Sequence, residues 1–359
     1  MLFSSDLATP VPVVDLDVLE MNIAGMASSA QSSGVSLRPH AKTHKSPEIA
    51  RRQVAAGASG LTVATISEAE VFASAGFSDL FIAYPLWVDP AKGRRLRALR
   101  EDVSLTVGVD SAEGARALAA QLSEDRREVG VLVEVDSGHH RTGVAPELAG
   151  ELADVAAHAG LDVRGVFTFP GHSYSPGRQV EVAEAERDAL LRAAGAVTGR
   201  GLGCDIVSGG STPTARLVGD AVLTEMRPGV YVFGDAQQFE LGTCFPEDIA
   251  LTLLATVVSH AGGNVVLDAG SKALGADRAG WATGFGRLLD HPAARITALA
   301  EHHAVVHWGD ESPLPELGSP IRVVPNHVCN AVNLADELVI VQGGAVVDKW
   351  PVAARGANT

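Results

Sequence analysis

Residues 104–135, SLTVGVDSAEGARALAAQLSEDRREVGVLVEV, contain the pattern that decides the fold of this chain. Two short runs rich in β-branched residues, Ser104–Val109 and Gly130–Val135, flank the helix-forming stretch Ala112–Leu122. This order is typical of neighbouring parallel strands that are joined by a crossover helix. The stretch therefore predicts one βα unit of a parallel sheet.

The same alternation extends to about residue 235 and contains the number of strands that closes a barrel. The strand candidates are Val35–Arg38, Leu61–Thr65, Leu80–Ala83, Ser104–Val109, Gly130–Val135, Val163–Phe167, Cys204–Val207 and Val230–Phe233. Helical stretches such as Ala91–Arg100 and Gln179–Thr198 lie between them. An open doubly wound sheet normally has fewer strands than a closed (β/α)8 barrel. We therefore predict an α/β fold with a TIM barrel over residues 13–238.

After about Asp235 the sequence changes to short apolar runs separated by Gly, Pro and Asn, with few helical stretches. These runs are Leu251–Ser259, Asn264–Leu267, Ala304–His307, Ile321–Val324, Glu337–Val341 and Ala345–Trp350. Such a pattern is typical of antiparallel sheets. A chain of 359 residues also exceeds the usual size of one core. We predict a smaller, mostly antiparallel β domain over residues 239–359, with residues 1–12 packed onto it.

Composition restricts the partners and the compartment of the protein. The chain is 46% hydrophobic and 20% charged, and its formal net charge is -15. An acidic surface repels the phosphate backbone, so we expect no nucleic-acid partner. We expect a cytoplasmic protein with no membrane partner, because the N-terminus lacks a signal peptide and no apolar run could span a bilayer. Three cysteines, Cys204, Cys244 and Cys329, are too few for a disulfide framework and are predicted to be reduced.

A lysine follows the first predicted strand, in the segment RPHAKTHK at residues 38–45. Functional residues of TIM barrels lie where strands end, and desolvation there lowers the pKa of a lysine amine so that it can attack a carbonyl. Lys42 is therefore a candidate for covalent catalysis. The structural alternative is that Lys42 and Lys45 are ordinary solvated charges, as most lysines are.

Two glycine-containing loops near the last predicted strands suit a phosphate group. They are VSGGSTPT at 207–214, with Ser211 and Thr212, and RPGVY at 227–231, with Gly229 and Val230. Backbone N–H groups at glycine turns and helix starts bind anions, and barrels often place phosphate after strands seven and eight. Each loop alone could be a plain turn. Neither loop has P-loop spacing, and no GxGxxG follows the first strand, which disfavours nucleotide cofactors.

Polar and aromatic side chains also follow the fifth and sixth predicted strands, in EVDSGHHRTG at 134–143 and FPGHSY at 169–174. Arg141 is a candidate for holding a carboxylate, and His172 for transferring protons. Tyr174 could contact a planar cofactor ring. Each of the three could equally be a satisfied structural residue of a polar loop.

A candidate metal site lies in the predicted β domain, in the segment VPNHVCNA at 324–331. On an extended segment, His327 and Cys329 would point to the same face. Imidazole and thiolate together favour zinc, and two protein ligands leave positions open for substrate and water. The structural alternative is a buried thiol beside a satisfied histidine. The cluster Glu301-His302-His303 is a rival metal site.

Taken together, six segments resemble the zinc-dependent D-serine dehydratase and D-threonine aldolase family. They are RPHAKTHKSPEIA at 38–50, VDSGHHRTGV at 135–144, GHSY at 171–174, SGGSTPT at 208–214, RPGVYVFGD at 227–235 and PNHVCNAVNL at 325–334. The resemblance covers nearly the whole chain. It implies a fold-type III pyridoxal-phosphate enzyme, related to alanine racemase and built as a barrel followed by a β domain.

The resemblance also implies roles for individual residues. Lys42 would bond covalently to pyridoxal 5'-phosphate, Tyr174 and Thr212 would contact it, and Gly229 and Val230 would offer N–H groups to its phosphate. His327 and Cys329 would bind the metal, and the protein would be a homodimer. Dehydratase-type members have H-x-C and use zinc, whereas aldolase-type members often have an acidic residue in place of the cysteine and use manganese or magnesium. Phe167 departs from the family, because the dehydratase pattern has a tyrosine there.

These residues lead to a hypothesis about the reaction and to three alternatives. We expect a lyase that converts D-serine to pyruvate and ammonia, with Lys42 removing the Cα proton and the metal assisting loss of the hydroxyl. In the aldolase alternative, His172 removes the proton of the β-hydroxyl, and D-threonine or 3-hydroxy-D-aspartate is cleaved to glycine and an aldehyde. Racemisation would not need a metal on the substrate. A non-catalytic pyridoxal-phosphate carrier would need neither H-x-C nor a second domain.

Overall fold

The computed structural model describes residues 7–122, 129–217, 222–309 and 313–359. The chain forms two compact units, which are described separately. The barrel unit contains the described parts of Met26–Lys42, Ala50–Gly229 and Ala357–Thr359. The β unit contains the described parts of Met1–Gly25, Thr43–Ile49 and Val230–Gly356.

The barrel unit is built on a parallel sheet with the strand order β2-β9-β8-β7-β6-β5-β4-β3. Its strands are β2 Ser36–Leu37, β3 Leu61–Val63, β4 Asp79–Pro85, β5 Ser104–Val109, β6 Gly130–Glu134, β7 Asp162–Phe167, β8 Ile206–Gly209 and β9 Glu225–Met226. A parallel bridge between His40 and Thr62 joins the segment after β2 to β3, which brings the two ends of the sheet together. The alanine-racemase-like barrel predicted from the sequence is therefore confirmed.

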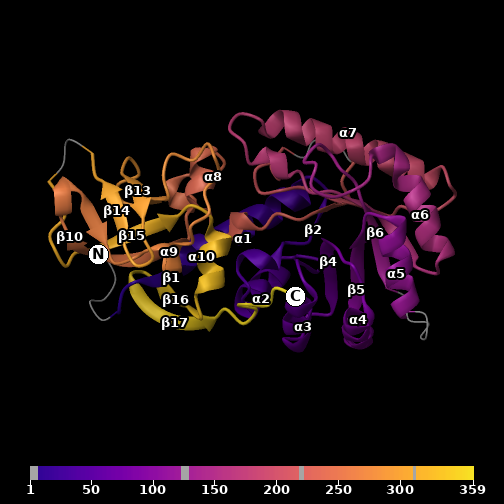
Figure 1. Cartoon of the computed structure of the whole chain (residues 1–359), viewed down its shortest axis with the longest axis horizontal. Helices are drawn as coiled ribbons and strands as arrows, with labels where there is room; N and C mark the ends of the chain where they lie inside the picture. The colour runs from indigo at the N-terminus through magenta and orange to yellow at the C-terminus, as the bar shows by residue number, and fades with distance from the viewer. Residues whose placement is uncertain (1–6, 123–128, 218–221, 310–312) are drawn as a thin grey trace. The chain divides into compact units, whose positions relative to one another are not determined.

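Helices cover the outside of this sheet, as Figure 1 shows for α4, α5 and α6 around β4, β5 and β6. The helices are α1 Leu16–Ser32, α2 Pro47–Ala55, α3 Ile66–Ser74, α4 Pro90–Asp102, α5 Ala112–Leu122, α6 Ala149–His158 and α7 Gln179–Thr198. Their starts follow from local chemistry. Asp89 caps α4 by accepting the N–H groups of Ala91 and Lys92, and Pro90 occupies the first turn, where its missing N–H is not needed.

Several predicted elements of the barrel match the observed bounds, and one is wrong. Ser104–Val109, Ala112–Leu122 and Gln179–Thr198 are confirmed. The eighth strand is not Val230–Phe233, because Val230–Val232 forms the 3-10 helix η4 and the eighth strand is β9. A short buried apolar run cannot be assigned to strand or helix from its periodicity alone.

Gly165 in β7 has no room for a side chain, because a Cβ there would lie 1.9 Å from the backbone oxygen of Ile206 in β8. Its φ of +149° is also unfavourable for other residues. We expect Gly165→Ala to lower the free energy of unfolding by several kcal/mol, on the order of 3. Gly195→Ala is the matched control, because nothing lies within 4 Å of its Cβ position on α7 and alanine favours helix. Denaturant unfolding of both variants checks the expectation, and equal stability of the two would contradict it.

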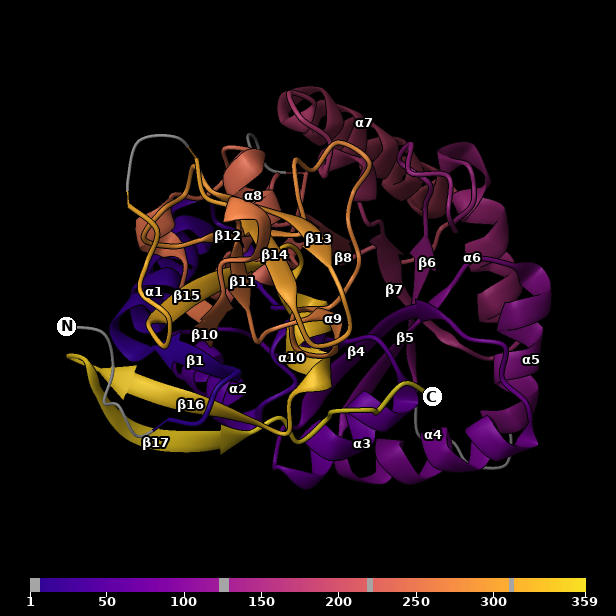
Figure 2. The same cartoon turned by 60° about the vertical axis from the view of Figure 1, so that its left-hand side comes forward.

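The β unit contains a closed antiparallel ring in which β10, β15, β12, β13, β14 and β11 pair in succession and β11 pairs back with β10. Its strands are β1 Val11–Asp15, β10 Leu251–Ser259, β11 Val265–Leu267, β12 Gly286–Leu288, β13 Arg295–Leu299, β14 Ala304–His307, β15 Pro320–Pro325, β16 Glu337–Gln342 and β17 Ala345–Pro351. The N-terminal strand β1 joins β10 to β16, and β16 continues into the hairpin with β17 that is prominent in Figure 2. The small antiparallel domain predicted from the sequence is confirmed.

The later helices of the β unit are short, and three strands of this unit escaped prediction. These helices are α8 Ala236–Glu240, α9 Ser271–Leu274 and α10 Val328–Leu334. The predicted strands Leu251–Ser259 and Ala304–His307 have the observed bounds, whereas β1, β12 and β13 were missed. β12 is only three residues long, and β13 alternates too weakly to stand out from its polar surroundings.

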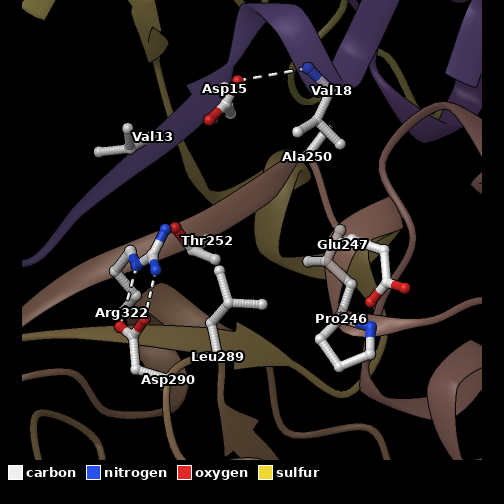
Figure 3. A pocket seen from close by; sticks show the side chains of 11 residues that line it. Val13, Asp15, Val18, Pro246, Glu247, Ala250, Thr252, Leu289, Asp290 and Arg322 are labelled. Atoms are coloured by element: carbon white, nitrogen blue, oxygen red, sulfur yellow. Dashed lines mark hydrogen bonds and ion pairs between the residues drawn. The ribbon is translucent and has the colours of Figure 1, made fainter. Parts of the chain in front are cut away.

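A cavity of about 280 Å³ lies in the β unit beside β1, β10 and β15 (Figure 3). Its lining includes the ion pair between Arg322 and Asp290, and Asp15, whose carboxylate accepts the N–H of Val18. None of the side chains predicted to be functional lines this cavity. It is therefore separate from the candidate site.

Two general expectations can be compared with the described residues. No helix in the described ranges is both long enough and apolar enough to cross a membrane. Within the described ranges, Cys204, Cys244 and Cys329 form no disulfide bond.

Candidate active site

Lys42 lies in the 3-10 helix η1, Ala41–Thr43, which follows β2 at the carboxyl end of the barrel. The preceding segment is fixed by backbone hydrogen bonds, in which His40 N donates to the carbonyl of Pro228 and Arg38 N to that of Met226. Lys42 itself is partly buried. The lysine is thus held at the rim of the barrel on a short rigid segment.

Three side chains of the barrel that were predicted to be functional lie around the ring of Phe169. The amine of Lys42 lies 5.5 Å and the guanidinium carbon of Arg141 lies 5.3 Å from the ring centroid of Phe169. The ring of Tyr174 is 6.3 Å from the same ring, and that of His139 is 5.9 Å away. Lys42, Arg141 and Tyr174, which follow three different strands, therefore lie near one aromatic side chain. The sequence analysis gave this side chain, Phe169, no role.

His172, the candidate base, is stacked on His139 with the ring centroids 6.3 Å apart. Gly138 and Gly171 leave room for this pair, since a Cβ on Gly171 would lie 2.5 Å from His139 Nε2. Burial, with added repulsion from Arg178, lowers the pKa of His172. Its Nδ1 is buried and has no hydrogen-bond partner among the described residues. A neutral imidazole of this kind can accept a proton at neutral pH.

The Gly/Ser/Thr loop after β8 is held together by its own hydroxyl groups. Ser211 is almost fully buried, and its Oγ lies 2.9 Å from the hydroxyls of both Ser173 and Thr214. Its backbone N–H donates to Thr214 Oγ1. Thr212 is partly exposed beside this cluster. Buried Ser211 therefore holds the loop in shape through its hydrogen bonds, while Thr212 is more exposed to solvent.

Gly229 and Val230 lie where the chain enters η4. Gly229 ends the loop after β9, and Val230 is the first residue of the 3-10 helix. The N–H groups at the start of a helix have no partner within it, which suits an anion. The phosphate-binding role that the resemblance implies for both residues stays a prediction.

Arg227 lies beneath the loops, in a buried polar network of the barrel unit. Its guanidinium donates to Ser208 Oγ and to the carbonyl of Thr168. Ser208 Oγ in turn donates to Glu225, which accepts from Arg38 Nε at 2.6 Å. The network spans strands β2, β7, β8 and β9, and it fixes their carboxyl ends.

Phe167, which departs from the family pattern, is fully buried beneath this guanidinium. Its ring packs edge-on against Phe81 at 5.1 Å, and the guanidinium carbon of Arg227 lies 5.2 Å from its centroid. Phe167 therefore provides an aromatic face on which the guanidinium of Arg227 is stacked.

Glu186 is a fully buried carboxyl of α7 that accepts the N–H of Gly210 at 2.6 Å. Burial raises its pKa to about 7, against the opposing effects of Gly210 and Arg227. The folded state binds this proton more tightly than the unfolded chain does. The resulting stabilisation is complete below pH about 4.5 and is lost as the pH rises through about 7.

We therefore expect Glu186→Gln to be more stable than the wild type at pH 8, by about 3 kcal/mol at most. The amide oxygen can still accept the N–H of Gly210 but cannot ionise. The two proteins should be equally stable near pH 4.5. Urea unfolding at both pH values measures this, and a pH-independent difference would contradict it.

His327 and Cys329 of the β unit are brought together, although their segment is not extended as predicted. His327 is the N-terminal cap of α10, and Cys329 is its second residue. The two side chains still interact, because the Cys329 sulfur, together with Asp277, raises the pKa of the His327 imidazole. The side chains of His327 and Cys329 are thus brought together by the first turn of a helix and not by a strand.

Three further residues, which the sequence analysis did not single out, support this pair. His327 Nδ1 lies 2.6 Å from Asp277 Oδ2, and Cys329 Sγ lies 3.4 Å from Thr43 Oγ1. Buried Asp235 caps α8 through the N–H of Gln238, and its second oxygen accepts the N–H of Val328. Thr43 and Asp235 lie within segments that were quoted for the family resemblance, but those motifs gave them no role, and Asp277 lies outside all six segments. The folded chain is therefore what brings the three residues to this pair.

The donor set fits a metal ion. Because His327 Nδ1 is engaged by Asp277, Nε2 is the ring nitrogen that could bind a metal ion, together with the sulfur of Cys329. Imidazole and thiolate are zinc ligands. Within the described ranges, no three His, Cys, Asp or Glu side chains gather to hold a metal. The rival cluster therefore does not form such a site, and its Glu301 pairs with Lys272.

Comparison with known proteins identifies the class of protein that this barrel and these loops define. Residues 14–237 match the family described as "Alanine racemase, N-terminal domain", and residues 250–341 match the "Putative serine dehydratase domain". The chain therefore belongs to the alanine-racemase-like fold-type III pyridoxal-phosphate enzymes.

Individual relatives narrow this class to lyases. The chain is 38% identical to D-threo-3-hydroxyaspartate dehydratase of Delftia sp. (strain HT23), over 90% of this chain and 91% of the relative. It is 35% identical to D-threonine aldolase of Arthrobacter sp, over 97% and 93%. A solved metal-free form of a cysteine-to-alanine variant of D-threo-3-hydroxyaspartate dehydratase superimposes with a TM-score of 0.89, at 34% identity, over 96% and 97% of the two chains.

Proposed function

We propose that this protein is a pyridoxal-phosphate- and metal-dependent dehydratase of β-hydroxy D-amino acids, with D-serine as its simplest substrate. The observation that carries the proposal is the connection through η1. Lys42 is adjacent in sequence to Thr43, and the hydroxyl of Thr43 lies 3.4 Å from Cys329 Sγ. Lys42, which would remove a proton, is therefore joined by one peptide bond to a residue that contacts Cys329, one of the two proposed metal ligands.

Each of the proposed residues would have a separate role in the reaction. Bound pyridoxal phosphate would stabilise the electron pair left on Cα, and a bound metal would polarise the β-hydroxyl. The amine of Lys42 would take the Cα proton, and hydroxide would leave Cβ. The aminoacrylate formed in this way tautomerises and hydrolyses to pyruvate and ammonia. Tyr174, Thr212, Gly229 and Val230 would hold the cofactor, with Ser211 beneath them.

A second candidate substrate is D-threo-3-hydroxyaspartate, which differs from D-serine by a β-carboxylate. Arg141 favours it, because its guanidinium lies over the same Phe169 ring as Lys42 and could pair with a carboxylate. The dehydratase from Delftia sp. bears the name of this substrate. The third candidate reaction is cleavage of D-threonine to glycine and an aldehyde, with neutral His172 as the base.

A product assay distinguishes these reactions. Purified protein with pyridoxal phosphate and zinc is offered D-serine, D-threo-3-hydroxyaspartate and D-threonine separately, and 2-oxo acid, ammonia, glycine and aldehyde are measured. Equal amounts of 2-oxo acid and ammonia from D-serine support the proposal, and formation of oxaloacetate identifies the second substrate. Glycine with aldehyde would replace the dehydratase assignment by the aldolase one. Absence of every product would refute the proposed lyase.

A further inference from the structure

We propose that Asp277 is the positioning residue of the metal clip His327/Cys329 and sets its affinity for the ion. The inference rests on the proposed metal site and goes beyond it, because Asp277 lies 50 residues before His327 and belongs to no motif of the sequence. It would act through the imidazole and not as a ligand.

The geometry assigns this role to Asp277. Its Oδ2 lies 2.6 Å from His327 Nδ1. An ionised carboxylate can only accept a hydrogen bond, so Nδ1 carries a proton, and Nε2 is the nitrogen left to bind the metal once its own proton is released. The contact therefore selects the tautomer that binds metal and fixes the plane of the ring. A carboxylate behind a ligating histidine also makes its free nitrogen a stronger donor.

Stability alone does not account for this contact. The side chains of His327 and Asp277 are 39% and 36% exposed. A partly exposed pair of this kind contributes little to folding. Asp277 is also not a third ligand, since no group of three suitable donors occurs within the described ranges. Orientation of the imidazole is the effect that remains.

The other parts of the clip are supported in the same manner, each by a different segment. The Cys329 thiol donates to Thr43 Oγ1 at 3.4 Å, and the Thr43 hydroxyl could donate in return once the thiol is deprotonated. Asp235 Oδ2 accepts the N–H of Val328, between the two proposed ligands. The sulfur of Cys329 and the backbone N–H of Val328 are thus each contacted by a residue from a distant segment. Asp277 has the corresponding position at the imidazole of His327.

The test measures zinc binding directly. The pyridoxal-phosphate-loaded protein is stripped with a chelator, and Zn²⁺ is titrated in competition with a chromophoric chelator. Asp277→Ala should weaken zinc binding about 10- to 100-fold. Asp277→Asn should lose less zinc affinity than Asp277→Ala, because its amide oxygen can still accept a hydrogen bond from Nδ1. Asp290→Asn is the matched control, since Asp290 forms a partly exposed ion pair with Arg322 in the same unit.

The outcomes separate this inference from the proposed function. If the wild type binds no zinc, the metal site itself is wrong. If the wild type binds zinc and Asp277→Ala binds it equally tightly, Asp277 has no positioning role. Thermal unfolding of the metal-free proteins shows whether Asp277→Ala is folded, and Asp277→Leu, which is close to aspartate in size but cannot accept a hydrogen bond, provides the affinity if it is not. Zinc affinity of Asp277→Leu equal to that of the wild type would then overturn the inference.

Discussion

We expect Lys42→Ala to lower kcat by at least about 10⁴-fold for every β-hydroxy D-amino acid that the wild type turns over. The side chain is the proposed covalent partner of the cofactor and the proposed base, so its loss removes both functions at once. The partly buried amine at the barrel rim, 5.5 Å from the centre of the Phe169 ring, is the structural basis for the expectation.

Covalent trapping checks this prediction without measuring turnover. Borohydride reduction of the wild type should add the mass of the cofactor to the peptide that contains Lys42, and the variant should gain none. Lys272→Ala is the control, because Lys272 forms an exposed ion pair with Glu301. Its kcat and its labelling should equal those of the wild type. Cofactor found on another lysine of the wild type would refute the assignment of Lys42.

Removal of the proposed metal, or of either of its ligands, should lower the dehydratase activity by more than about 100-fold. Hydroxide is a poor leaving group, so elimination is slow unless a Lewis acid acts on the β-hydroxyl. His327→Ala and Cys329→Ala should also lose bound zinc. Metal analysis of the purified proteins, and activity after chelation and re-addition of zinc, measure both effects.

The same experiment identifies the metal. Imidazole and thiolate predict that zinc restores the chelated enzyme better than manganese or magnesium does. Cys204→Ala is the control, because burial raises the pKa of this thiol and disfavours the thiolate that a metal needs. Full activity of the chelated wild type would show that the reaction proceeds without a metal. Preference for manganese would favour the aldolase-type assignment.

Much of the fold could be predicted because its signals are local. The strand at Ser104–Val109 and the helices at Ala112–Leu122 and Gln179–Thr198 each carry a periodicity or composition that their own residues determine. The last barrel strand was misplaced for the opposite reason. β9 has only two residues and exists because Glu225 and Met226 pair with β2 on one side and β8 on the other. Such pairing involves residues far apart in the sequence.

The same distinction between local signals and long-range contacts applies to the candidate site. The proposed reactive groups could be named from the sequence, because a lysine at a strand end and an H-x-C segment are visible as motifs. Only the tertiary structure decided what surrounds them: Phe169 beneath Lys42 and Arg141, and Asp277 behind His327. The physical reason is that reactivity depends on residue type, whereas orientation, burial and pKa depend on neighbours that the folded chain brings from distant segments.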